Sequence, residues 1–286
     1  EKILIYGDYD VDGTTAVAVM YRFLDKVIQE QGTKSQDIID YYIPDRYTEG
    51  YGVSTQGIDY ASAQGCRLII TLDCGIKAVE KVAYAASKGI DVIVCDHHTP
   101  GDELPAAVAV LNMKRHDCPY PYKELSGCGV GFKLAQAYTQ QYGLPFDNLV
   151  PLLQLLAMSI ASDIVPITGE NRILAHFGIQ QLNKTPFIGL SAIMQVASIE
   201  AKTLTINDLV YKIGPRINAC GRMKSGRAAV ELLLTDDPVF ARQQAEEVNQ
   251  HNEDRRDCDT ETTKEALQQL LDDPTFANRR STVVYA

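Results

Sequence analysis

The amino-acid sequence predicts an α/β fold: a parallel, Rossmann-like sheet with flanking helices, followed by a helical subregion and a long linker helix. Three observations lead to this prediction. Short apolar runs alternate with segments whose apolar side chains recur at helical spacing. Several of these runs are apolar on both faces, which is typical of parallel strands covered by helices on each side. Aspartates lie at the end of three of the runs.

The first expected strand and helix enclose a run of acidic residues. Residues 3–6 form an apolar run of β type, and residues 14–31 carry apolar side chains at helical spacing. The loop between them places three aspartates at alternate positions, Asp8, Asp10 and Asp12. Because neighbouring carboxylates repel one another, a divalent cation such as Mg²⁺ or Mn²⁺ would stabilise them.

Two structural alternatives exist for this acidic run. An EF-hand calcium loop needs a glutamate at its twelfth position, where this chain has Val19, so that alternative is excluded. In the second alternative, Asp12 caps the helix and the other two carboxylates are solvated. The run taken alone does not decide between a cap and a metal site.

Strands and helices continue to alternate along the first part of the chain. We expect further strands at residues 38–43, 68–72, 90–95 and 108–111. We expect helices at residues 55–64, 78–88, 132–142 and 149–161. The glycine-rich run Ser126–Gly131 precedes the third of these helices, and its spacing differs from the dinucleotide-binding fingerprint. We therefore favour close packing of helix on sheet there over phosphate binding.

Acidic residues and histidines follow two later strands. Asp73 comes after the third strand, and Asp96-His97-His98 comes after the fourth. Because the carboxyl ends of parallel strands meet at one edge of a sheet, these residues are expected near the three aspartates of the first loop. Asp73 could instead cap a helix and His97 could be a core histidine, but the coincidence of all three groups indicates a metal site. Imidazole among carboxylates favours Mn²⁺.

Other stretches suggest further ligands. Asp163 lies just past the helix at 149–161, where a carboxylate faces the negative end of the helix dipole and needs a compensating cation. Arg46 lies in a polar loop, as an ion-pair partner or as a phosphate contact. The Gly-rich turn expected at Gly214–Arg222 suits phosphate contact through Arg216, Asn218 and Arg222. A solvated turn is the alternative for that stretch.

The last part of the chain reads as helical. Several short helices are expected between residues 170 and 234, and residues 238–271 form a long polar helix suited to bridging two domains. Residues 282–285 look like the start of a strand. We expect a catalytic domain at 1–236 (α/β core 1–166, helical part 167–236), a connecting helix at 237–275, and the first strand of a truncated C-terminal domain at 276–286.

Composition narrows the class of protein. The 286 residues can bury a sizeable core, and the formal net charge of −10 argues against a simple basic nucleic-acid binder. No apolar run approaches the roughly 20 residues of a membrane helix, and no signal peptide opens the chain. The seven cysteines are scattered and form no C-x-x-C pair. We expect buried, reduced thiols in a cytoplasmic protein with no membrane partner.

The motifs resemble those of a known family. Gly7–Gly13, Asp73-Cys74-Gly75, Asp96-His97-His98 and Ser162-Asp163 occur in the order of the DHH phosphoesterase motifs. Glu49–Gly52 and Gly214–Arg222 look like the RecJ branch, the single-stranded-DNA-specific 5′→3′ exonucleases of bacteria. The resemblance implies a phosphodiesterase with two Mn²⁺ ions per site and Mg²⁺ also usable. It further implies a role in DNA recombination and repair, with single-strand-binding protein and a helicase as partners.

The resemblance also implies roles for individual residues. The metal ligands would be Asp8, Asp10, Asp12, Asp73, His97 and Asp163, with Asp73 bridging the two ions. Asp73 and His98 would be catalytic, His98 through contact with the substrate phosphate. The substrate-binding residues would be Arg46, Arg216, Asn218 and Arg222. The alternatives are a DHH phosphodiesterase acting on cyclic dinucleotides or very short oligonucleotides, and a non-catalytic nucleic-acid scaffold.

Overall fold

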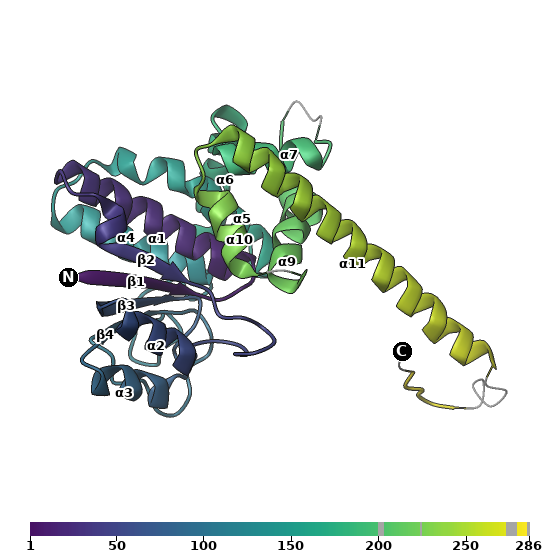
Figure 1. Ribbon diagram of the computed structural model, residues 1–286, viewed down its shortest axis with the longest axis horizontal. Helices are drawn as coiled ribbons and strands as arrows, with labels where there is room; N and C mark the ends of the chain where they lie inside the picture. The colour runs from purple at the N-terminus through teal and green to yellow at the C-terminus, as the bar shows by residue number, and fades with distance from the viewer. Residues whose placement is uncertain (200–202, 224, 273–278, 285–286) are drawn as a thin grey trace.

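A five-stranded parallel sheet forms the centre of the first part of the chain in this computed structural model (Figure 1), which describes residues 1–199, 203–223, 225–272 and 279–284. The strand order is β2-β1-β3-β4-β5, and every neighbouring pair is parallel. The strands are β1 Lys2–Gly7, β2 Ile39–Tyr42, β3 Cys66–Leu72, β4 Asp91–Cys95 and β5 Ala109–Leu111. All five lie where the apolar runs predict them.

Helices cover both faces of the sheet. The helices of the α/β part are α1 Val11–Glu30, α2 Thr55–Ala63, α3 Val79–Ser87, α4 Gly127–Gln141 and α5 Leu153–Ser162. Along β1, Leu4 and Tyr6 pack into the cluster beneath α2 and α3, whereas Ile5 packs into the cluster beneath α1 and α4. This alternation shows why the strand is apolar on both faces, and the predicted α/β class is confirmed.

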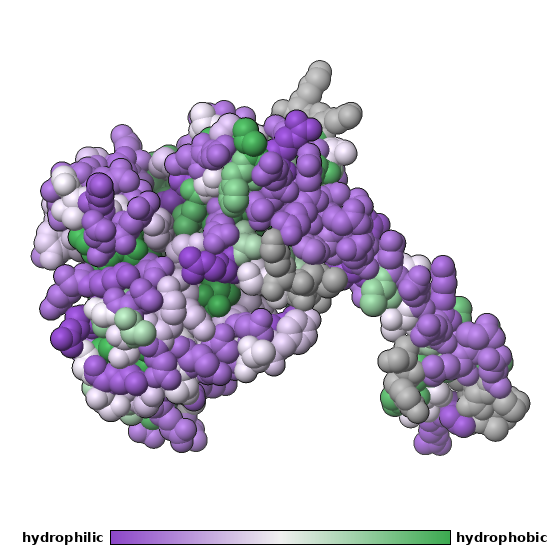
Figure 2. All heavy atoms as spheres, in the orientation of Figure 1, coloured by the Kyte–Doolittle hydropathy of each residue, from purple (hydrophilic) through white to green (hydrophobic). Residues whose placement is uncertain are grey.

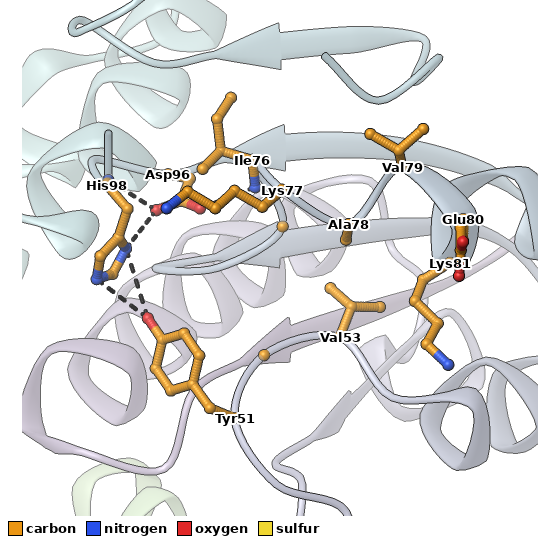
Figure 3. A pocket seen from close by; sticks show the side chains of 12 residues that line it. Tyr51, Val53, Ile76, Lys77, Ala78, Val79, Glu80, Lys81, Asp96 and His98 are labelled. Carbon is orange, nitrogen blue, oxygen red and sulfur yellow. Dashed lines mark hydrogen bonds and ion pairs between the residues drawn. The ribbon is translucent and has the colours of Figure 1, made fainter. Parts of the chain in front are cut away.

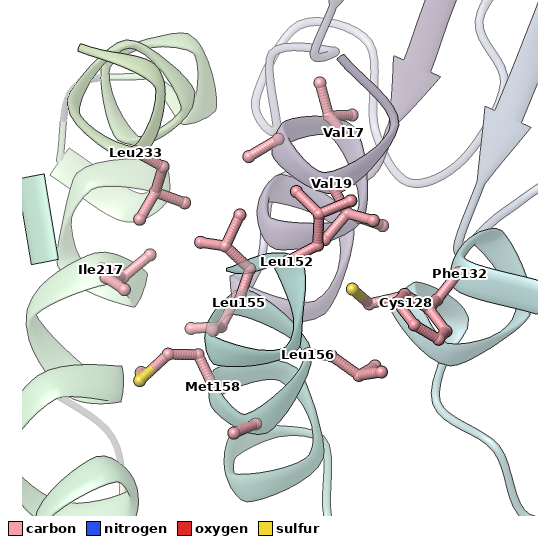
Figure 4. Close-up of a cluster of buried hydrophobic side chains, with 14 of the residues drawn as sticks. Val17, Val19, Cys128, Phe132, Leu152, Leu155, Leu156, Met158, Ile217 and Leu233 are labelled. Atoms are coloured by element: carbon pink, nitrogen blue, oxygen red, sulfur yellow. The ribbon is translucent and has the colours of Figure 1, made fainter. Parts of the chain in front are cut away.

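The second part of the chain is helical and shares the larger core. Its helices are α6 Gly169–Lys184, α7 Ile188–Val196, α8 Ile206–Asp208, α9 Gly214–Met223, α10 Gly226–Leu234 and α11 Pro238–Asp272. Short 3₁₀ turns lie at Ser35–Asp37, Phe146–Asn148 and Val150–Leu152, and a π-helical turn at Leu209–Ile213. Figure 4 shows Leu155 of α5 between Val19 of α1 and Ile217 of α9, within one continuous apolar cluster.

Two helices differ from their sequence predictions. α4 begins at Gly127 and not at residue 132, because Ser126 caps it by accepting a hydrogen bond from the Gly129 amide at 3.1 Å. A Cβ on Gly127 would clash with Asp73, and one on Gly131 would press on Leu72. The glycine run therefore serves close packing inside the helix, which confirms the packing interpretation but not the predicted boundary.

The predicted Gly-rich turn at Gly214–Arg222 is wrong, because these residues form helix α9. The glycines there let other parts of the chain approach closely: a Cβ on Gly214 would meet Ser162, and one on Gly221 would meet the carbonyl of Tyr9. Pro215 is tolerated because it lies in the first turn of the helix. Glycine content alone therefore does not identify a turn.

Helix α11 is present as predicted and extends away from the rest of the chain (Figure 1). Its buried residues, Ala241, Ala245, Val248 and Asn252, all lie in its first half. Figure 2 shows mostly hydrophilic residues over its visible surface. Residues 281–284 form no strand, because a strand needs a partner for its backbone hydrogen bonds. The remaining residues of that expected strand, 276–278 and 285–286, lie outside the described part of the chain.

Candidate metal centre

The carboxyl ends of β1, β3 and β4 bring the sequence-predicted ligands together. Asp8 follows β1, Asp73 follows β3, and His97 follows β4 by two residues. His97 Nε2 lies 3.2 Å from Asp73 Oδ1, 3.5 Å from Asp163 Oδ2 and 3.8 Å from Asp12 Oδ2. The predicted juxtaposition of residues spread over 155 positions is therefore present in the fold.

Three overlapping groups of side chains could each hold a metal ion. Within each group, one ligand atom per residue lies within 4.8 Å of the others. The groups are Asp73/His97/His98, Asp12/His97/Asp163 and Asp8/Asp10/Asp73. Asp73 and His97 each belong to two groups, so they lie at the centre of the cluster.

Several buried ligand atoms have no hydrogen-bond partner among the described residues. These atoms are both carboxylate oxygens of Asp8, Asp73 Oδ1, His97 Nε2 and Asp163 Oδ2. A buried polar atom without a partner costs about 1–3 kcal/mol, and more when it is charged. Divalent cations would satisfy all of these atoms at once, and a mixed carboxylate and imidazole set fits Mn²⁺ or Mg²⁺. The residues present therefore fit the metal ions that the motifs imply.

Burial and mutual repulsion perturb the carboxylates strongly. Burial, reinforced by the charge of Asp10, raises the pKa of Asp8 from 3.8 to about 7. Burial, then the charges of Asp12 and Asp10, raises the pKa of Asp163 to about 9. The same causes raise the pKa of the fully buried Asp73. Positive charge between these groups would reverse the effect.

Asp12 differs from its neighbours because its carboxylate is fully hydrogen-bonded. The amides of Gly127 and Cys128, at the N-terminus of α4, donate to it at 2.6 and 2.8 Å, and Ser159 Oγ donates at 2.7 Å. Ser126 Oγ lies 2.6 Å from Ser159 Oγ. Because Ser159 gives its proton to Asp12 and Ser126 accepts from an amide, Ser126 must donate to Ser159. These contacts fix the position and orientation of the Asp12 carboxylate.

The backbone at Asp73 is in the left-handed region, with φ of 60°. Aspartate is one of the few side chains that tolerates this conformation, and such residues cluster at functional sites. Thr71 Oγ1 donates to the carbonyl of Cys74 at 3.0 Å and stabilises the turn. The turn directs Asp73 back into the cluster.

The two histidines are held in different ways. His97 Nδ1 donates to the carbonyl of Leu125 at 3.1 Å, so Nε2 carries the lone pair that faces the carboxylates. Burial lowers the pKa of His97 and favours this neutral form. His98 Nδ1 donates to Asp96 Oδ1 at 2.8 Å, and this hydrogen bond raises the pKa of His98. His98 Nε2 lies 3.1 Å from the Tyr51 hydroxyl.

Asp96 orients His98 and was not assigned a role in the sequence prediction. Burial favours its neutral form, but hydrogen bonds from the side chain and backbone of His98 and from the amide of Ile76 outweigh it and lower its pKa. Ser126, Ser159 and Tyr51 were also missed. Ser126 has a recognisable signal, a serine before a helix, whereas no local pattern distinguishes Ser159 inside the apolar helix α5.

The predicted substrate-binding residues are only partly brought together. The Arg46 guanidinium lies 5.2 Å from the centre of the Tyr9 ring, and both residues line a cavity of about 180 Å³ with Asp10 and Asn218. Asn218 Oδ1 accepts from the amide of Val11 at 3.1 Å. Arg46 and Asn218 therefore lie beside the acidic loop.

Of the two arginines of α9, the structure describes the side chain of Arg216, which bonds to other parts of the protein. Arg216 donates to Asn249 Oδ1 at 2.9 Å and to the carbonyl of Lys212 at 2.7 Å, and burial lowers its pKa. The contact with Asn249 ties α9 to α11. Arg222 belongs to α9, and its side chain lies outside the described part of the structure.

Five of the seven cysteines are buried, Cys118 is half-buried and Cys258 is exposed. All seven are free thiols, but the expectation that they are buried is wrong for Cys118 and Cys258. Within the described residues, no helix is long and apolar enough to cross a membrane.

The fold and the cluster together define a class of protein: an α/β protein that presents a carboxylate and histidine centre at the carboxyl ends of parallel strands. The DHH family, N-terminal domain, matches residues 2–160. The chain therefore belongs to the DHH family.

Within the DHH family, the chain is similar in sequence to the curated RecJ exonucleases. The single-stranded-DNA-specific exonuclease RecJ of Bacillus subtilis (strain 168) is 38% identical over 270 residues, covering 94% of this chain and 33% of that protein. RecJ of Escherichia coli (strain K12) is 37% identical over 276 residues, covering 93% of this chain and 47% of that protein. The chain thus spans between a third and a half of the length of these relatives.

Solved structures agree with this likeness. Exonuclease RecJ bound to manganese has a TM-score of 0.82 at 29% identity, covering 94% of this chain and 65% of the other. RecJ of Thermus thermophilus in complex with Mg²⁺ has a TM-score of 0.66 at 26% identity, covering 96% of this chain and 34% of the other. The resemblance inferred from the motifs is confirmed.

Proposed function

We propose that this chain carries the active site of a metal-dependent, single-stranded-DNA-specific exonuclease with 5′→3′ polarity, acting in DNA recombination and repair. The observation that carries the proposal is the cluster of buried ligand atoms, centred on Asp73 and His97, that have no hydrogen-bond partner in the described part of the chain. The names of the curated relatives support the substrate, since they describe single-stranded-DNA-specific exonucleases. None of those names favours cyclic dinucleotides.

The three ligand groups suggest how the cluster divides. We assign Asp8, Asp10 and Asp73 to one cation and Asp12, His97 and Asp163 to a second, with Asp73 shared. Mn²⁺ is the preferred ion and Mg²⁺ is also usable, because the set combines carboxylates with one imidazole. When bound, such a pair supplies an activated water and a counter-charge for the leaving oxygen.

His98 is the group of this chain that neutralises charge on the substrate phosphate. Asp96 fixes its ring and favours its protonated form, so Nε2 can donate to a phosphate oxygen. The Tyr51 hydroxyl, 3.1 Å from that nitrogen, shows that an oxygen can reach it. His98 therefore holds the phosphate next to the metal ligands.

Arginines and an asparagine would hold the rest of the strand. Arg46 and Asn218 would contact a neighbouring phosphate, and their position beside Asp10 in one small cavity supports this role. The hydrogen bonds of Arg216 to Asn249 and Lys212 use two of its five N–H donors, so others can serve substrate. Arg222 is assigned to substrate binding from the motif Gly214–Arg222 alone. The protein would work in the cytoplasm with single-strand-binding protein and a helicase as partners, as the family resemblance implies.

The test replaces Asp73 with asparagine, which keeps the size of the side chain and tolerates its backbone conformation. We expect nucleotide release from a 5′-labelled single strand in Mn²⁺ to fall by more than about a hundredfold, since metal stabilisation is worth several kcal/mol. Asp102→Asn, at an exposed loop aspartate, is the control. A folded Asp73→Asn protein with activity near that of the control would refute the assignment.

A further inference from the structure

We propose that the cavity beside His98 binds one nucleoside of the DNA strand, next to the phosphate under attack. This inference rests on the proposed function and adds a base-binding subsite to it. The cavity, called here the His98 cavity, has a volume of about 560 Å³. Its lining residues are Tyr51–Val53, Gly75–Lys81, Asp96 and His98. Pockets of about 300–1,000 Å³ are the usual size for small organic ligands.

His98 joins the cavity to the metal centre. Its Nδ1 lies 4.0 Å from Asp73 Oδ1, and the same ring forms part of the cavity wall. Figure 3 shows His98 and Tyr51 at one end of the cavity and Val79 and Lys81 at the other. A phosphate that contacts both His98 and the cations therefore places its attached nucleoside at the mouth of the cavity.

The walls suit a nucleobase of any sequence. Val53, Ile76 and Val79 supply apolar surface, and the Tyr51 ring supplies an aromatic face. Bases stack on aromatic rings with little sequence preference, because every base has a flat face. Lys77 is exposed on the rim, has no ion-pair partner among the described residues, and could pair with the next phosphate.

The loop that carries Tyr51 is held firmly on both sides. Glu49 accepts hydrogen bonds from the Tyr42 hydroxyl at 2.9 Å and from the amide of Asp45 at 2.8 Å. The Gly52 carbonyl accepts one from the Tyr6 hydroxyl at 2.9 Å. Gly50 and Gly52 have φ of 82° and 84°, so the chain turns sharply on each side of Tyr51. The motif thus presents one exposed aromatic ring on a fixed loop.

The first experiment compares two probes on the unmodified protein in Mn²⁺ by calorimetry. Thymidine 5′-monophosphate carries a base, and 2-deoxyribose 5-phosphate does not. We expect the nucleotide to bind about tenfold more tightly, because stacking a base is worth about 1–3 kcal/mol. Equal affinity of the two probes would overturn the subsite while leaving the proposed function intact. Absence of Mn²⁺ binding would instead refute the proposed function.

The second experiment fills the cavity with Val79→Trp. The nucleotide should lose about tenfold in affinity and approach the sugar phosphate, while the affinities for Mn²⁺ and for the sugar phosphate stay as in the unmodified protein. Val108→Trp is the matched control. Val108 is 68% exposed and directly precedes β5, so it lies at the amino ends of the strands, whereas the His98 cavity lies at their carboxyl ends. Nucleotide binding by Val79→Trp equal to that of the control would contradict the proposal. If Val79→Trp does not fold, the comparison of the two probes on the unmodified protein still tests whether the cavity binds a base.

Discussion

At the scale of single residues, the carboxylates of the cluster differ in what holds them. Asp12 receives two amide donors and one hydroxyl donor, whereas Asp8, Asp73 and Asp163 each bury at least one oxygen without a partner among the described residues. Asp12 is therefore held in place by the protein, and the other three need an external positive charge. The sequence pattern predicted all four as ligands but could not separate these roles, because the donors to Asp12 come from residues more than a hundred positions away.

Ser159 offers a direct test of how Asp12 is positioned. Ser159→Ala removes one of three donors, and loss of such a supporting contact typically lowers metal affinity about 10–100-fold. Mn²⁺ titration measures this, with Ser87→Ala as the control because Ser87 is exposed and far from the cluster in the fold. An unchanged Mn²⁺ affinity in Ser159→Ala would show that the two backbone amides alone hold Asp12 in position.

Ile164 is a strained residue beside the site. Its φ is 54°, a conformation that a β-branched side chain rarely adopts, and the side chain is 99% exposed. Ile164→Gly should raise the melting temperature by about 2 °C, because the left-handed conformation costs about 1–2 kcal/mol and no burial is lost. The control is Ile173→Gly, an exposed position inside α6, which should lower it. A lower melting temperature for Ile164→Gly would show that the backbone at Ile164 is not strained.

At the scale of helices and strands, the hydrophobic period predicted every strand and most helices. Buried strands are short apolar runs, so their ends were visible in the sequence, and the fold class placed those ends at one edge. The two helices that differ from their predictions share one cause. At α4 and α9 the glycines suggested a loop or a turn, but they make room for Asp73 and for Tyr9 against a helix. Such tertiary contacts leave no local signal in the sequence.

Helix α11 should show two levels of stability along its length. Its first half buries Ala241, Ala245 and Val248 and receives Arg216 through Asn249, whereas residues 256–272 bury no side chain. Backbone amides open most readily where few apolar contacts hold them. We expect hydrogen exchange to be slow at residues 241–252 and fast at residues 256–272. Uniform slow exchange along α11 would mean that the second half is held by contacts absent from the described structure.

At the scale of the whole molecule, the buried carboxylates link stability to pH and metal. Their pKa values in the folded protein, about 7 for Asp8 and about 9 for Asp163, lie above the unfolded value of 3.8. Between these values the folded state binds more protons than the unfolded state, so this contribution to stability falls as pH rises from about 4 to about 9. Burial of the carboxylates is the main cause, and repulsion by neighbouring aspartates adds to it.

Divalent cations should reverse this trend, since they bind the ionised carboxylates and compete with protons. We expect the rise in melting temperature on adding Mn²⁺ to chelator-treated protein to be small at pH 5 and larger at pH 8. Thermal unfolding at several pH values measures it. An equal rise at both pH values would show that these carboxylates do not bind the ion.

The central claim is that one cluster holds two cations that share Asp73. Anomalous scattering at the manganese edge, from a crystal soaked in Mn²⁺, tests this claim most directly. The account predicts two peaks that both contact Asp73, one of them also in contact with Asp8 and Asp10 and the other with Asp12, His97 and Asp163. A single peak, or peaks away from Asp73, would contradict it.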